Sequence, residues 1–109
     1  LMTVVCSGTL CLSPSSISNS NITDNSGDIS FTDYASGDQS LLYWRAAGAA
    51  TWTEVGNATS PVNLTGLIGC TEYEYYMATV CGTDTSSFSA VQSFITMGCG
   101  NCIDLSYCA

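Results

Sequence analysis

Apolar and polar residues alternate along most of the chain, which is the pattern of β-strands whose two faces meet different environments. The alternating stretches recur about every ten residues and are separated by clusters of Gly, Asn, Asp and Ser, which favour turns. No stretch shows the three- and four-residue spacing of an amphipathic helix over three turns. The pattern predicts strands over residues 17–23, 28–34, 40–46, 51–55, 61–65, 72–81 and 88–97. We therefore expect one all-β domain, an antiparallel sandwich.

Charge narrows the range of partners, because the chain is strongly acidic. It has nine acidic side chains, a single Arg, no Lys and no His, and its formal net charge is −8. A surface that binds nucleic acid needs Lys and Arg to displace counterions, so we expect no nucleic-acid partner. An anionic membrane would be repelled for the same reason, and no apolar run of about 18 residues predicts membrane insertion. Without His, the commonest general base and metal ligand is missing, so we expect neither an enzyme nor a cofactor.

Seven cysteines in 109 residues is a high density. Small domains rich in cysteine are typical of oxidising compartments, where disulfides persist. The composition therefore predicts an extracellular or cell-surface location and a fold stapled by disulfides. Because the number is odd, at least one cysteine has no partner within this sequence. Its thiol is a candidate for a bond to another module or subunit, and the alternative is a partner in a segment outside this sequence.

A series of motifs along the chain resembles a known family. The motifs are Trp44-Arg45 with Gly48, Trp52-Thr53-Glu54-Val55, Leu64-Thr65-Gly66-Leu67, Thr71-Glu72-Tyr73-Glu74-Tyr75, Phe88-Ser89 and Phe94-Ile95-Thr96. In order and spacing, residues 12–98 resemble a fibronectin type III domain of a bacterial secreted or cell-surface protein. The resemblance implies a seven-stranded immunoglobulin-like sandwich in which the Tyr73 hydroxyl packs the preceding turn. Phe31 stands where the family usually has Trp, and we expect Phe to fill the core there.

Two terminal segments flank this domain. We expect residues 1–11 to form an N-terminal strand or linker that engages a neighbouring module or subunit, and residues 99–109 to form a Cys-rich linker. The segment LMTVVC at 1–6 matches FITMGC at 94–99 with a constant offset of 93 (99 − 6), and a further Cys follows each match. An offset of one module length indicates either a tandem array or a filament built by strand addition. A chance match between two short β-rich segments is the alternative.

The family topology also implies which cysteines pair. Cys70 and Cys81 bracket one predicted strand and lie more than about 30 Å apart, too far to bond to each other. In this topology Cys81 lies at the end of the sandwich where the chain enters, near Cys6 and Cys11. Cys70 lies at the opposite end, near Cys99 and Cys102. On this resemblance we predict the disulfides Cys11–Cys81 and Cys70–Cys99.

Three further cysteines are candidates for bonds between modules or subunits. They are Cys6, Cys102 and Cys108, with a local Cys102–Cys108 pair as an alternative. A second alternative is zinc, because Cys99 and Cys102 have Cys-x-x-Cys spacing and Cys70 and Cys108 could complete four thiolate ligands. An oxidising compartment favours disulfides over such a site, so we expect no metal.

Glycan attachment is the other modification that the sequence suggests. Asn21, Asn57 and Asn63 each begin an Asn-x-Ser/Thr sequon, and the Gly-Asn turn favours Asn57. The four aspartates between residues 24 and 38 could supply oxygen ligands to calcium, but their spacing does not match a calcium-binding loop. Turn formation explains them better. Glu72 and Glu74 share a strand face by alternation alone, and no nucleophile or acid–base partner accompanies them.

Exposed aromatic side chains are a further candidate site. A module of this size cannot bury all of its two Trp, six Tyr and three Phe, and exposed rings stack on sugars or on partner proteins. The simpler interpretation is structural. On that interpretation Trp44 belongs to the core and Trp52 covers its edge.

These features together predict an extracellular structural module, one repeat or subunit of a surface array or pilus-like filament, held by disulfides at its ends. Its partners would be copies of itself or adjacent modules, and glycans. The alternative is a carbohydrate- or protein-binding accessory module of a secreted enzyme or adhesin. Binding would then use aromatic strand faces or the loops 35–39 and 82–87. Tight sugar binding by a monomer would favour the alternative, whereas loss of assembly in Cys6→Ser would favour the structural module.

Overall fold

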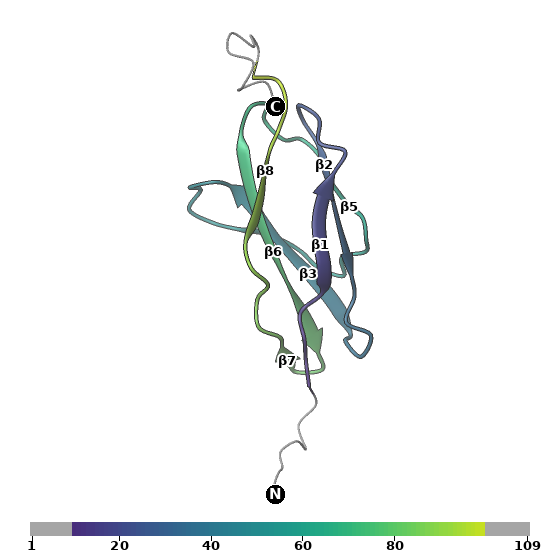
Figure 1. The fold of residues 1–109 in the computed structure, drawn as a ribbon. Coiled ribbons are helices and arrows are strands. Elements are labelled where there is room, and N and C mark those ends of the chain that lie inside the picture. The colour runs from purple at the N-terminus through teal and green to yellow at the C-terminus, as the bar shows by residue number, and fades with distance from the viewer. Residues whose placement is uncertain (1–9, 100–109) are drawn as a thin grey trace, which may run out of the picture.

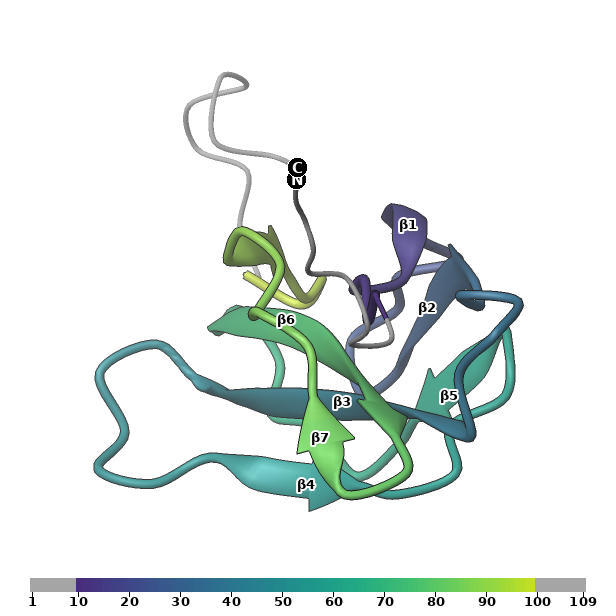
Figure 2. The ribbon, with the colours of Figure 1, turned by 90° about the horizontal axis from the view of Figure 1, so that it is seen from below.

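The computed structural model describes residues 10–99, which form an antiparallel β-sandwich of two sheets without a helix (Figure 1). The smaller sheet has the order β1-β2-β5, and the larger has the order β4-β3-β6-β7, with β8 also paired to β6. The strands are β1 (Ser15–Ser20), β2 (Gly27–Thr32), β3 (Gln39–Ala46), β4 (Thr53–Val55), β5 (Val62–Leu64), β6 (Glu72–Cys81), β7 (Asp84–Thr85) and β8 (Gln92–Ile95). Figure 2 shows the smaller sheet grouped on one side of the sandwich. Among the described residues, no helix is long and apolar enough to cross a membrane.

The predicted all-β sandwich is confirmed, and β6 has the predicted boundaries, whereas those of the other strands differ from the prediction. Each predicted strand has a counterpart, although the first spans Ser15–Ser20 instead of 17–23. The two-residue strand β7 was not predicted; it pairs with the end of β6 after a turn in which Gly82 has a φ of 64°. A strand of two residues shows no alternation, so periodicity could not reveal it.

The last predicted strand, 88–97, is shortened to the four residues of β8. Serine side chains interrupt the backbone pairing with β6 in the segment that precedes β8. The N–H of Met77 donates to the Ser89 hydroxyl, and the N–H of Thr79 donates to the Ser86 hydroxyl, each at 2.9 Å. These hydroxyls satisfy the N–H groups of β6 in place of the carbonyls of a paired strand. The chain therefore runs beside β6 before regular pairing begins in β8.

β6 is the central strand of the larger sheet and supplies much of the core. It has ten residues, and it pairs with β3 along one edge and with β7 and β8 along the other. Its side chains alternate as predicted: Tyr73, Tyr75, Met77 and Thr79 face inward and are at most 4% exposed. The residues that pack with them share an apolar character and come from both sheets; they include Ile29, Phe31, Leu42, Leu64, Leu67 and Phe94.

Tyr73 holds the turn before β6, as the resemblance implies. Its hydroxyl accepts a hydrogen bond from the N–H of Ile68 at 2.8 Å. Its ring lies between Trp44 and Phe94, at centroid distances of 5.9 and 5.8 Å. Phe31 is buried in the same core, so Phe does fill the position where the family usually has Trp.

A polar bridge that was not predicted joins the edges of the two sheets. The amide of Asn19 in β1 donates to the Tyr75 hydroxyl at 2.8 Å, and this hydroxyl donates to Gln92 of β8 at 3.1 Å. The Gln92 amide in turn donates to the carbonyl of Ile17 at 3.0 Å. Burial raises the pKa of Tyr75, while the hydrogen bond from Asn19 acts in the opposite direction.

Candidate functional site

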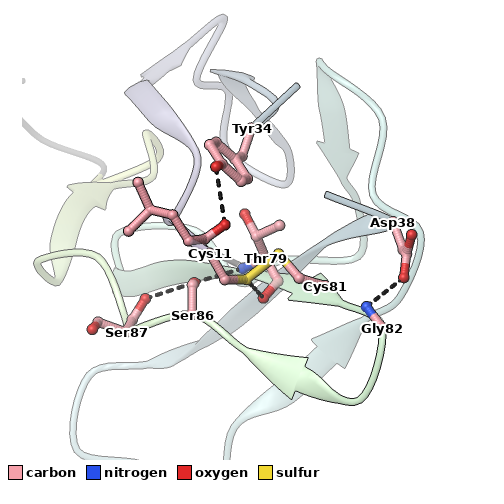
Figure 3. The surroundings of a disulfide bond; sticks show 9 residues. Cys11, Tyr34, Asp38, Thr79, Cys81, Gly82, Ser86 and Ser87 are labelled. Atoms are coloured by element: carbon pink, nitrogen blue, oxygen red, sulfur yellow. Dashed lines mark hydrogen bonds between the residues drawn. A yellow bond between two sulfur atoms is a disulfide. The ribbon is translucent and has the colours of Figure 1, made fainter. Parts of the chain in front are cut away.

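One end of the sandwich is closed by the disulfide Cys11–Cys81 (Figure 3). Its Cα atoms are 6.0 Å apart, and it joins residues separated by 70 positions. The Tyr34 hydroxyl donates to the carbonyl of Leu10 at 3.0 Å, which adds a second contact to the entering segment. The Asp38 carboxylate accepts a hydrogen bond from the residue after Cys81 at 2.5 Å. The entering chain is thus fixed to the C-terminal end of β6.

The opposite end is closed by the disulfide Cys70–Cys99, with Cα atoms 4.5 Å apart. The N–H of Cys70 donates to the carbonyl of Met97 at 2.8 Å. The Thr96 hydroxyl accepts from the N–H of Thr71 at 2.9 Å and donates to a nearby carbonyl at 2.7 Å. The leaving chain is thus fixed next to the N-terminal end of β6.

Both disulfide pairs implied by the family topology are present, and they share one strand. Cys81 is the last residue of β6, and Cys70 precedes its first residue by two positions. β6 therefore carries a covalent attachment to the entering chain at one end and to the leaving chain at the other. We call these two attachment points the disulfide poles.

The other predicted cysteine sites fall outside the described residues. Cys6, Cys102 and Cys108 lie there, as do nearly all of the two predicted terminal segments. The zinc alternative required thiolates from Cys70 and Cys99, and it is wrong for these two residues because they are bonded to each other. Within residues 10–99, no group of three or more His, Cys, Asp or Glu side chains could hold a metal ion.

A second candidate site lies on the outer face of the larger sheet. Four aromatic side chains contact one another there and form what we call the outer aromatic cluster: Tyr43, Trp52, Tyr76 and Phe88. The Tyr76 ring is central, with its centroid 4.9 Å from Tyr43, 4.7 Å from Trp52 and 4.9 Å from Phe88. Phe88 is 62% exposed, whereas the other three are partly buried. Desolvation, followed by the nearby charge of Glu54, raises the pKa of Tyr43.

The single cation of the chain belongs to this face. Arg45 donates to the Glu74 carboxylate at 2.8 Å and to the carbonyl of Ala49 at 2.8 Å, and its guanidinium lies 4.1 Å from the centroid of the Trp52 ring. Trp44 packs on the core as predicted, but the prediction that Trp52 covers its edge is wrong. Trp44 faces the core, and neighbouring residues of a strand point to opposite faces, so Arg45 faces outward. The Trp52 ring lies against Arg45 and is therefore on the outer face as well.

Comparison with known proteins rests on structure, since no family model and no curated protein matches the sequence. A computer-based redesign of a beta sandwich protein superposes with a TM-score of 0.74 at 20% identity, over 84% of this chain and 96% of that chain. A segment of two fibronectin type III domains from chicken tenascin superposes with a TM-score of 0.66 at 23% identity, over 76% of this chain and 49% of that chain. The chain has the fibronectin type III fold. A segment of titin also superposes, with a TM-score of 0.64 at 20% identity, over 78% of this chain and 32% of that chain.

In this fibronectin type III fold, the three sequon asparagines are exposed. The amides of Asn21 and Asn63 both donate to the Asp28 carboxylate, at 2.9 and 2.7 Å. The bond from Asn21, followed by that from Asn63, lowers the pKa of Asp28. Asn57 lies in the turn after β4 with a φ of 49°. Exposure is compatible with glycan attachment, which stays a prediction at all three positions.

The loop 35–39, a predicted binding segment, borders a hollow of the fibronectin type III fold. The hollow has a volume of about 350 Å³ and lies between residues 33–40 and the turn 57–59. Its wall is tied together by a hydrogen bond from the Ser40 hydroxyl to the Asp33 carboxylate. The second predicted loop, 82–87, contains β7 and also Ser86, whose hydroxyl accepts a hydrogen bond from the N–H of Thr79 in β6. The Asp38 carboxylate of the first loop accepts a hydrogen bond from the N–H of Gly82 in the second, so the two loops are joined at the same end as the Cys11–Cys81 pole.

Proposed function

We propose that this chain is an extracellular structural module, one repeat or subunit of a surface array or filament. The observation that carries the proposal is that the two disulfide poles attach the entering and leaving chain to opposite ends of one central strand. A module joined to neighbours in series needs ends that stay bound to the fold, and a disulfide provides such an attachment. The density of cysteines suits an oxidising location.

Two further features support a structural role. In the sequence, Cys6 precedes the first disulfide pole, and Cys102 and Cys108 follow the second, where bonds to neighbouring modules would form. Arg45, the single cation of the sequence, is paired with Glu74 of the same module, which offsets its charge. The fold by itself hosts many functions, and similarity to tenascin or titin therefore adds no function here.

A denaturing gel of the native material, run with and without reductant, tests the proposal. A high-mass species unaffected by reductant would support a tandem array. A ladder that collapses to a band near the module mass of 11.4 kDa would support disulfide-linked subunits. A small band in both lanes, together with a monomeric mass under native conditions, would overturn the structural module.

The outer aromatic cluster favours a second candidate function, a carbohydrate- or protein-binding accessory module. Its exposed member, Phe88, is the ring best placed to meet a ligand. Titration of the monomer with soluble polysaccharides, followed by tryptophan fluorescence, tests for sugar binding through Trp52, which contacts the same cluster. Saturable binding that is lost in Phe88→Ala would favour this candidate, and an unchanged signal in both proteins would count against sugar as the ligand.

A further inference from the structure

The two disulfides create a short covalent route through the module. From Cys11 the route crosses to Cys81, follows the chain back to Cys70, and crosses again to Cys99. The stretch of chain on this route is residues 70–81, which we call the bypass segment, and its last ten residues form β6. All the other strands belong to parts of the chain that lie off the route.

We propose that the module acts as an inextensible link, in which tension applied at its two ends is transmitted along the bypass segment and spares the rest of the fold. The inference rests on the proposed function, because tension at both ends requires neighbours attached there. Without the disulfides, tension between residues 11 and 99 would pull on 88 residue steps (99 − 11), a length of chain that contains every strand.

The bypass segment is already close to its full length. Eleven residue steps separate positions 70 and 81, and at the rise of a strand they cover about 36 Å. The same steps cover at most about 40 Å when the chain is fully extended. Tension on this route therefore lengthens the module by only about 4 Å, even where every hydrogen bond of β6 is broken.

Load on this route does not pull β6 past its neighbours. The load enters the strand at Cys81 and leaves it next to Cys70, so the two ends of the same strand are pulled apart. The hydrogen bonds from β6 to β3 and β8 are perpendicular to the strand and do not oppose this pull. Covalent bonds of one extended backbone bear the tension, and the core stays assembled.

Removal of each disulfide places a different length of chain under load. In Cys70→Ser/Cys99→Ser the route continues from residue 81 to 99, which is 18 steps and at most about 65 Å. In Cys11→Ser/Cys81→Ser it runs from residue 11 to 70, which is 59 steps and at most about 212 Å. With all four cysteines replaced, the full 88 steps span at most about 317 Å.

Single-molecule stretching of the full chain, held between two handle domains of known unfolding length, tests the proposal. The intact chain should show no unfolding step longer than about 10 Å, because only the bypass segment can lengthen. The expected step is the extended length of the released chain minus the length of the folded module. It is about 25 Å for Cys70→Ser/Cys99→Ser, about 170 Å for Cys11→Ser/Cys81→Ser and about 270 Å with all four cysteines replaced. Cys6→Ser, which keeps both disulfides, is the matched control and should stretch like the intact chain.

An unfolding step longer than about 20 Å in the intact chain would overturn the inextensible link, since the route through β6 supplies only about 4 Å. This outcome does not depend on whether the variants fold. It is also separate from the gel experiment. A chain that never assembles would overturn the proposed function and leave the step lengths unchanged, whereas an extensible intact chain would overturn the link and leave assembly unaffected.

Discussion

Removal of either disulfide should destabilise the module by an amount set by the loop that the bond closes. Cys11–Cys81 joins residues separated by 70 positions, and Cys70–Cys99 joins residues separated by 29. The chain-entropy relation gives about 4.4 kcal/mol for the longer loop and about 3.6 kcal/mol for the shorter one at 25 °C. Domains of this size unfold with about 5–15 kcal/mol, so each bond accounts for a large part of the total.

The assay is urea unfolding without reductant, followed by tryptophan fluorescence, for the intact chain and for two paired variants. Cys11→Ser/Cys81→Ser and Cys70→Ser/Cys99→Ser each remove both partners of one bond, so neither variant gains an unpaired thiol. The free energy of unfolding should fall in both variants, and further in the first. Because the unfolded chain becomes more open, the dependence on urea should also steepen.

Ser87→Ala is the control for the Cys11–Cys81 pole, because Ser87 is an exposed neighbour of the bond that the change leaves intact. It should change the free energy of unfolding by less than about 0.5 kcal/mol. If loss of Cys11–Cys81 lowered this free energy by less than about 1 kcal/mol, or by less than loss of Cys70–Cys99 did, loop length would not set the stabilisation.

Three further predictions concern single side chains and are checked by unfolding curves. Tyr73→Phe should cost about 1–2 kcal/mol, because it leaves a backbone N–H without its acceptor, whereas Tyr76→Phe on the outer face should cost less than about 0.5 kcal/mol. Burial raises the pKa of Tyr75, so the unfolded chain releases this proton first and the free energy of unfolding should fall as the pH rises above about 10; a fall of equal steepness in Tyr75→Phe would contradict this. Gly37→Ala should cost about 1–3 kcal/mol, because its added Cβ meets the methyl group of buried Thr79; an unchanged midpoint would show that the site has room.

The alternation of apolar and polar residues was the strongest sequence signal. It predicted side-chain orientation best in strands that have one buried face. The inward side chains of β6, Tyr73, Tyr75, Met77 and Thr79, follow from period two alone. The role of the Tyr73 hydroxyl and the filling of the core by Phe31 came from the family resemblance instead, since no periodicity reports what a hydroxyl contacts. The disulfide pairs also required the topology, because spacing excluded the Cys70–Cys81 bond and could not choose among the others.

Contacts that depend on register or on a single side chain could not be predicted. Tyr43 and Tyr76 stack because they are directly opposite in the β3–β6 pairing, and the sequence carries no measure of that register. Trp52 was expected inside a strand over 51–55, but β4 begins at Thr53, so alternation does not fix its face. Its position follows from the contact with the Arg45 guanidinium. The Ser89 hydroxyl accepts the hydrogen bond of the Met77 N–H in place of a backbone carbonyl. Regular pairing of the last strand therefore begins later than the alternation predicts.

Disulfide mapping of the native, unreduced chain tests most directly whether both chain ends are bonded to β6. After free thiols are blocked, cleavage at the arginine, the glutamates and the methionines places Cys11, Cys70, Cys81 and Cys99 on four different fragments. These fragments are 3–45, 55–72, 78–97 and 98–109. If both chain ends are bonded to β6, the first fragment is linked to the third and the second to the fourth. A third fragment linked to the fourth, or a first fragment that is free of the third, would contradict this arrangement.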